Sequence, residues 1–132
     1  MGNKTSYIPR YSHEDYKKQR PGKNIYKIDQ NNVYWRGNKI QADGLSFVDF
    51  NGGYGQDCKY LFYRGHSINK HLKTFVYLKD GYGRGTNVVF YRGKKIKADP
   101  NTFKIFVNGY ARDSDNIYYN GKIYKKRQKP EF

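Results

Sequence analysis

The chain repeats itself every 28 residues without an insertion or deletion. Four glycines mark the period, and three sets of aromatic residues keep the same interval. A chain of this kind stacks one small unit on the next, which favours function on an extended surface over function in a unique pocket. The residues that recur are Gly37, Gly65, Gly93 and Gly121; Trp35, Tyr63, Tyr91 and Tyr119; Phe47, Phe75 and Phe103; and Tyr26, Tyr54, Tyr82 and Tyr110.

Each repeat contains the signals of a β-hairpin. A strand such as 33–36 recurs at 61–64, 89–92 and 117–120, and a glycine follows it each time. Because glycine reaches positive φ at little cost, we expect a two-residue turn at Gly37-Asn38 and at the equivalent positions 65–66, 93–94 and 121–122. Further strands are expected at 48–50, 76–78 and 105–107. About three strands in each repeat predict an all-β fold of tandem 28-residue β-hairpin repeats, forming a twisted antiparallel sheet or a short β-solenoid.

Alternation along the first strand of each repeat separates two faces. The expected core is the face that carries the Trp35 series together with Val33, Leu61, Val89 and Ile117. Phe47, Phe75 and Phe103 follow turns that contain Asp or Pro, and they are expected to return the chain to that core. The opposite face is expected to carry an aromatic series beside an arginine series, which are Tyr34, Phe62, Phe90 and Tyr118, and Arg36, Arg64 and Arg92.

Composition agrees with a folded, β-rich and tyrosine-rich chain. Aromatic residues make up 18% of the sequence, and they bury large areas and favour strands. The net charge is +15, and its distribution predicts three segments. These are a basic N-terminal arm at 1–25, a β-repeat domain of about 3.5 repeats at 26–124, and a basic C-terminal tail at 125–132.

The segment from Tyr110 to Lys122, with its run Asp115-Asn116-Ile117-Tyr118-Tyr119, resembles the repeat of the DKNYY family. Residues 94–103 are similar to the middle segment of that repeat. The resemblance covers roughly 26–124, and it departs in the second repeat, where Lys70-His71 replaces the Ala-Asp pair. It implies tandem tyrosine-rich repeats, and it assigns no catalytic residue or cofactor to a position of this sequence.

Arginine among aromatic residues is the clearest candidate for chemistry. Arginine contacts phosphate or carboxylate, and exposed rings can stack on bases. The same residues also suit a plain structural role, because arginine stacks on neighbouring rings at a solvated face. The basic arms add further cations that would bind an anionic partner. The candidate anion-binding residues are Arg36, Arg64, Arg92, Lys17, Lys18, Arg20, Lys125, Lys126 and Arg127.

Signals of catalysis are weak. His66 and His71 lie five apart, which is not a metal-binding spacing, and Cys58 is alone, which fits a reducing compartment. The recurring Asp residues fall at turn positions, as Asx turns predict. We therefore expect no enzyme activity, no metal, no cofactor and no small-molecule substrate. No apolar run is long enough to span a bilayer, so an intracellular, soluble and non-secreted protein is expected.

Three functions remain open from the sequence. The first is a non-enzymatic structural or adaptor protein that binds acidic protein neighbours within a larger assembly, such as a virion or a ribonucleoprotein particle. The second is a nucleic-acid-binding module that uses the arginine and aromatic face. The third is a small bacterial protein that binds and neutralises a toxin or effector.

Overall fold

The structure is a computed structural model, and it describes residues 26–128. This part of the chain consists of short strands and turns and contains no helix, which confirms the predicted all-β fold of tandem hairpin repeats. The predicted N-terminal arm at 1–25 and the last four residues, 129–132, lie outside the described residues.

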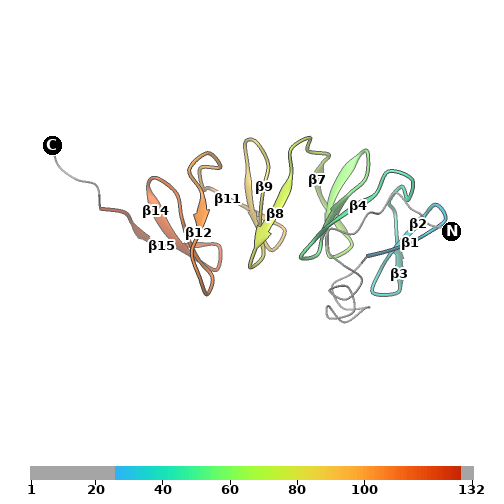
Figure 1. Cartoon of the computed structure of the whole chain (residues 1–132), viewed down its shortest axis with the longest axis horizontal. Coiled ribbons are helices and arrows are strands. Elements are labelled where there is room, and N and C mark those ends of the chain that lie inside the picture. The colour runs from blue at the N-terminus through green and yellow to red at the C-terminus, as the bar shows by residue number, and fades with distance from the viewer. Residues whose placement is uncertain (1–25, 129–132) are drawn as a thin grey trace. The chain divides into compact units, whose positions relative to one another are not determined.

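The strands form four antiparallel sheets, none of them closed into a barrel (Figure 1). In every sheet each strand pairs with its neighbour in the chain. The first sheet contains β1 (Tyr26–Asp29), β2 (Asn32–Trp35) and β3 (Asn38–Ile40), and the second contains β4 (Val48–Asn51), β5 (Tyr54–Gln56), β6 (Tyr60–Tyr63) and β7 (His66–Lys70). The third contains β8 (Val76–Lys79), β9 (Tyr82–Arg84), β10 (Val89–Tyr91) and β11 (Lys94–Ile96), and the fourth contains β12 (Lys104–Ile105), β13 (Tyr110–Arg112), β14 (Asn116–Tyr119) and β15 (Lys122–Lys126).

The expectation of three strands in each repeat was too low. The second, third and fourth sheets each have four, because the segment that begins with the recurring tyrosine also pairs as a strand. A tight turn makes this pairing local: Asp80 and Gly81 both have positive φ between β8 and β9, as do Asn108 and Gly109 between β12 and β13. Asp-Gly and Asn-Gly are the preferred sequences of this turn, and they were available as a signal.

The chain divides into two compact units, one ending at Leu72 and the other beginning at Lys73. The described part of the first unit holds the first two sheets, and the second unit holds the last two. Each unit has its own core, built from the recurring aromatic residues and the strand residues between them. The core of the first unit contains Tyr26, Val33, Trp35, Phe47 and Phe62, and that of the second contains Tyr82, Val89, Ala98, Phe103, Ala111 and Tyr118.

The predicted phenylalanine anchors are buried, and two of them lie on glycine. The ring of Phe47 packs so closely on Gly55 that a Cβ at this glycine would overlap it, and Phe75 lies on Gly83 in the same way. Burying one such ring contributes about 1.5–3 kcal/mol. Phe103 is also buried, and Ala111 takes the glycine position in that repeat.

Candidate anion-binding surface at the hairpin tips

Arginine occupies the turns themselves, which corrects the predicted turn positions. Positive φ occurs at Arg36, Arg64 and Arg92 (51°, 48° and 48°) and at the glycine after each of them (84°, 86° and 83°). The turns are therefore Arg36-Gly37, Arg64-Gly65 and Arg92-Gly93, one residue earlier than expected. Each arginine stands at the tip of a hairpin and not on the face of a strand.

The left-handed conformation is costly for arginine. It costs an ordinary L-residue about 1–2 kcal/mol, whereas asparagine adopts it readily and Asn-Gly is the favoured sequence for this turn. The fourth repeat has that favoured pair, Asn120-Gly121, with φ of 49° and 81°. Three arginines at a position that suits asparagine better indicate a use for the side chain.

The backbone and stem of Arg64 are held firmly. Its N–H donates to the carbonyl of Gly53 (2.7 Å), and its Cγ lies over that glycine, 3.1 Å from where a Cβ would stand. Its guanidinium carbon lies 5.8 Å from the ring centroid of Trp35, within the range of a cation–π contact. The turn at Arg92 repeats the backbone bond, from its N–H to the carbonyl of Gly81 (2.8 Å).

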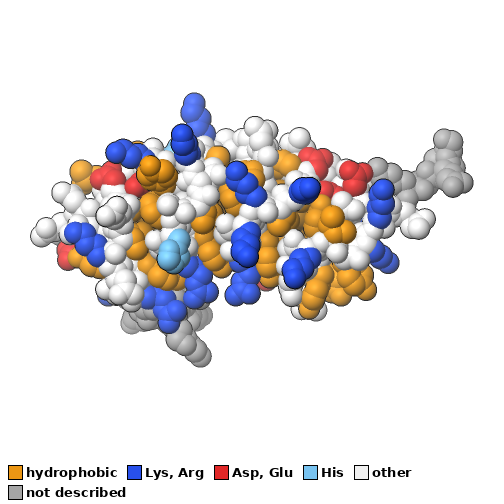
Figure 2. Space-filling view, turned by 180° about the vertical axis from the view of Figure 1, so that it is seen from behind, with side chains coloured by type: hydrophobic (Ala, Val, Ile, Leu, Met, Phe, Trp, Pro, Cys, Tyr) orange, Lys and Arg blue, Asp and Glu red, His pale blue; other side chains and the backbone are white. Residues whose placement is uncertain are grey.

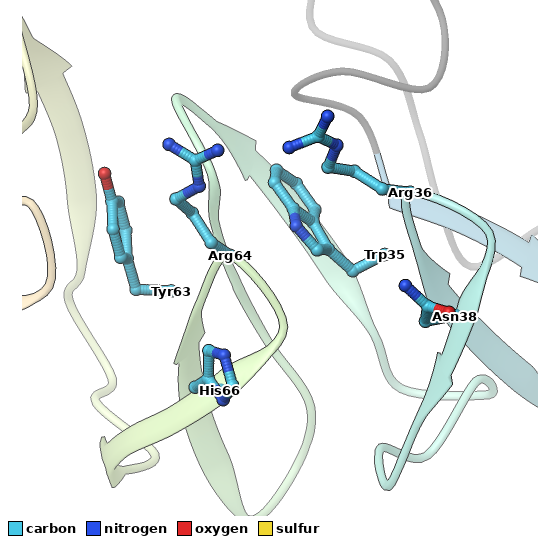
Figure 3. Close-up of a pocket in the computed structure, with 6 residues that line it drawn as sticks. All are labelled: Trp35, Arg36, Asn38, Tyr63, Arg64 and His66. Atoms are coloured by element: carbon cyan, nitrogen blue, oxygen red, sulfur yellow. The ribbon is translucent and has the colours of Figure 1, made fainter.

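Two arginine tips meet in the first unit at an open hollow of about 610 Å³, lined by Trp35, Arg36, Asn38, Tyr63, Arg64 and His66 (Figure 3). Figure 3 shows Tyr63, Arg64, Trp35 and Arg36 in one row, so that rings and guanidinium groups alternate. We call these four residues the arginine–tryptophan ladder. Arg36 is exposed, Arg64 is half-buried, and no acidic residue of the described chain lines the hollow. The ladder thus presents two cations to solvent.

Buried aspartates serve the fold by accepting backbone N–H groups. Oδ1 of Asp57 accepts the N–H groups of Lys59 and Tyr60, and its Oδ2 accepts the N–H of Asp43. This arrangement confirms the expected Asx turns. Figure 2 shows many Lys and Arg side chains scattered over one face of the molecule, with fewer acidic groups among them.

Asp113 plays the same part in the second unit. It accepts the N–H groups of Asp99, Asp115 and Asn116 and the hydroxyl of Tyr118 (2.8–2.9 Å). Burial alone would raise the pKa of this carboxyl, but the backbone donors outweigh it, and the pKa lies below its ordinary value. Asp113 is therefore a charged structural acceptor.

The predicted aromatic face is wrong for three of its four residues. Phe62, Phe90 and Tyr118 are buried at 3%, 0% and 1% exposure, because both faces of these strands are covered. Tyr34 alone is half-exposed. A platform for stacking bases on this series is therefore absent from the described chain.

The predicted basic tail is in part a strand. Lys125 and Lys126 belong to β15, where they pair with Ile117 and Asn116. Arg127 donates from its guanidinium to the carbonyl of Asp113 (2.8 Å). The other predicted anion-binding residues, Lys17, Lys18 and Arg20, lie outside the described residues.

Sequence reasoning missed the ladder. It placed Trp35 in the core and Arg36 and Arg64 on a strand face, so it did not bring them together. The sequence does contain a signal for it. With the turn one residue earlier, at Arg-Gly, an aromatic residue directly precedes each tip, as in Trp35-Arg36-Gly37 and Tyr63-Arg64-Gly65.

Residues 26–128 contain no helix long and apolar enough to cross a membrane. They contain no group of three or more His, Cys, Asp or Glu side chains placed to hold a metal ion. No curated protein and no solved structure matches the chain. The model of the DKNYY family matches residues 22–122, which include all four hairpin tips. With its repeats, their tips and most of its length inside that match, the chain belongs to the DKNYY family.

Proposed function

We propose that the protein is a non-enzymatic adaptor that binds acidic protein surfaces through its arginine hairpin tips. The observation that carries the proposal is the arginine–tryptophan ladder, in which two cations flank a ring on turns that disfavour arginine. Carboxylates pair well with the planar guanidinium group, since both of their oxygens can be bound at once.

A protein partner suits these residues better than a nucleic acid does. Stacking on single-stranded bases needs exposed rings, and Phe62, Phe90 and Tyr118 are buried. Trp35 is itself 8% exposed, so it supports the arginines more than it offers a face for stacking. The setting we propose is a larger assembly with acidic subunits, such as a virion. An acidic toxin or effector would use the same chemistry.

The test measures binding of the full chain to three fluorescent probes of similar charge across a salt series. The probes are a poly-glutamate peptide, a single-stranded RNA and a duplex DNA. The key variant is Arg36→Asn/Arg64→Asn, because asparagine suits positive φ and the turns should be retained. Its control is Lys27→Gln/Lys59→Gln, which removes two charges from exposed positions of the same unit.

We expect the ladder variant to lose roughly tenfold or more in affinity for poly-glutamate, since each hydrogen bond to a charged group contributes about 1.5–3 kcal/mol. The control should lose much less. Equal losses in the two variants would show that only net charge matters and would refute the ladder as the site. Tighter binding of RNA or DNA, lost in the same variant, would replace the acidic protein with a nucleic acid.

A further inference from the structure

Each unit contains the same contact between its two sheets. In the first unit the hydroxyl of Tyr26 donates to the carbonyl of Gly53 (2.7 Å) and accepts from the N–H of Gly65 (3.0 Å). A Cβ placed on Gly65 would lie 3.0 Å from Cβ of Trp35 and 3.3 Å from Cγ2 of Ile40. The glycine of one hairpin tip therefore sits against a ring and an isoleucine of the preceding sheet.

The second unit repeats this contact 56 residues later. The hydroxyl of Tyr82 donates to the carbonyl of Gly109 (3.2 Å) and accepts from the N–H of Gly121 (2.9 Å). Gly121 lies so close to the ring of Tyr91 that a Cβ there would overlap it. The face that receives a hairpin tip is thus formed by Tyr26, Trp35 and Ile40 in the first unit and by Tyr82 and Tyr91 in the second, where Ile96 occupies the position equivalent to Ile40.

The fourth sheet has the same three positions, of which the first is half-buried and the other two are exposed. They are Tyr110, Tyr119 and Tyr124, each 28 residues beyond its counterpart in the third sheet. Tyr119 is 42% exposed and Tyr124 58%, whereas Trp35 is 8% exposed. Their rings already pack together, with the Tyr110 centroid 4.6 Å from that of Tyr119 and 5.6 Å from that of Tyr124. We call this tyrosine set the end face.

The first sheet has a hairpin tip of the kind that docks on such a face. Its tip glycine, Gly37, has the φ of the docked tips (84°), and apart from its two chain neighbours no residue of the described chain lies within 4 Å of a Cβ placed there. Gly65 and Gly121, by contrast, are covered by the preceding sheet of their unit. Among the described residues, the first unit therefore has a bare tip at Gly37, and the second unit has an open receiving face at Tyr110, Tyr119 and Tyr124.

We propose that the end face of one chain receives the Arg36-Gly37 tip of a second copy. The contact would reproduce the one inside each unit: the Tyr110 hydroxyl would accept from the N–H of Gly37, and the Tyr119 ring would lie on that glycine. The two surfaces differ, so the association is head-to-tail and can continue beyond a dimer. In the template, Arg64 stays half-exposed while its tip is docked, so docking leaves the tip arginine accessible.

Charge gives this association its own signature. Each copy carries +15, so two copies repel each other at low ionic strength, and added salt screens that repulsion. Self-association should therefore strengthen as salt rises. Binding of an acidic partner through the ladder should weaken over the same range, and so the failure of one proposal is distinguishable from the failure of the other.

The first experiment is sedimentation equilibrium of the full chain in 0.1 and 1 M NaCl, conditions that bracket roughly a threefold change in the screening length. We expect the average mass to rise above 15.6 kDa with protein concentration, and more steeply at high salt. Tyr119→Lys should abolish the rise. Its control, Leu45→Lys, changes another exposed apolar side chain, 70% exposed, and should leave the rise intact.

The second experiment mixes two blocked chains. Gly37→Asn places a side chain on the bare tip, where asparagine tolerates positive φ, and Tyr119→Lys blocks the end face. Each variant alone should be monomeric, and an equimolar mixture should form a dimer and nothing larger, because one free tip and one free face remain. Circular dichroism and melting of each variant establish that it is folded.

A wild-type chain that stays monomeric at high salt would overturn the proposal. So would an association that survives Tyr119→Lys, or a mixture of the two folded variants that stays monomeric.

Discussion

The two units are built from the same contacts but differ at one hairpin tip. In both, a buried tyrosine hydroxyl joins the two sheets: Tyr26 in the first unit and Tyr82 in the second. In both, an aspartate collects backbone N–H groups. The tip of the second hairpin is Arg64 in the first unit and Asn120 in the second, with nearly the same φ. The turn is thus kept without arginine at this tip, as the proposed binding role of Arg64 requires.

A second difference is a hydrogen bond to the buried aspartate that only the second unit has. Tyr118 of the second unit donates its hydroxyl to Asp113, whereas the equivalent residue of the first unit, Phe62, has no hydroxyl to offer Asp57. The second unit therefore has one more hydrogen bond at this point. Substitutions at the tip and at the aspartate can therefore test whether the two units differ in stability as these contacts predict.

Removal of the aspartates should have the largest effect on stability. Asp57→Ala and Asp113→Ala each leave three backbone N–H groups without their acceptor, which costs roughly 3–5 kcal/mol. Asp113→Ala should cost more by about 1 kcal/mol, because the Tyr118 hydroxyl also loses its partner. Urea unfolding measures both. The fluorescence of Trp35, the one tryptophan of the chain, reports on the first unit.

The exposed Asp29→Ala serves as the control, with an expected change near zero. Equal, small costs for all three variants would mean that the aspartates do not hold the repeats together. The pKa of Asp113 is lowered in the folded unit, so its contribution is present above the ordinary value of 3.8 and is lost as the pH falls through the lowered pKa.

Removal of the bridging hydroxyls should have the next largest effect. Tyr26→Phe and Tyr82→Phe each leave a tip N–H unbonded and remove one of the two donors to a buried glycine carbonyl, at a cost of about 1–3 kcal/mol. The two costs should agree, because the contact is the same in both units. Tyr34→Phe, at a half-exposed position, is the matched control. A cost in one unit only would break the equivalence of the two interfaces.

A smaller difference in stability between the two units is expected at alkaline pH. Burial raises the pKa of Tyr118 to about 12, and the neighbouring Asp113 adds to this. The raised pKa means that its contribution is complete below pH 10, the ordinary value, and falls as the pH rises towards 12. Burial also raises the pKa of Tyr26 and Tyr82. Unfolding of Tyr118→Phe should therefore depend less on pH between 10 and 12 than unfolding of the wild type does. An unchanged dependence would contradict the assignment to Tyr118.

The smallest effect on stability is expected at the tips. Arg64→Asn should leave stability unchanged or raise it by up to about 1 kcal/mol, because asparagine suits positive φ better. Trp35 fluorescence during urea unfolding measures the change. A loss of more than about 1 kcal/mol would mean that the stacking on Trp35 is a folding interaction, as the structural role predicts.

The sequence was sufficient for the repeat, the all-β class and most of the core, because a fixed period of aromatic residues leaves few alternatives. Val33, Leu61 and Val89 are fully buried, as the alternation predicts. The prediction is wrong in the fourth repeat, where Ile117 is half-buried and Tyr119 is 42% exposed, because no further repeat of the described chain covers that sheet. The prediction for the opposite face is wrong because alternation of apolar and polar residues marks a sheet with one face exposed to solvent. Here the opposite face is covered as well, and Phe62 and Phe90 are buried.

The candidate site depended on an offset of one residue. The sequence pattern predicts glycine as the first residue of the turn, whereas it is the second, and this shift moves Arg36 and Arg64 from a strand to a tip. The contact of Arg64 with Trp35 joins two repeats. A period in the sequence shows that repeats exist, but it does not show which side chains of neighbouring repeats touch.

The most direct test of the central claim exchanges the tip residues between the units. Arg64→Asn removes an arginine tip from the first unit, and Asn120→Arg adds one to the second. Gly109 lies beneath Asn120 as Gly53 lies beneath Arg64, so the added stem has a place to lie. Affinity for a poly-glutamate peptide at fixed salt should fall in the first variant and rise in the second, with both chains folded. Unchanged affinity in both would contradict the account, because the tips would then be turns and nothing more.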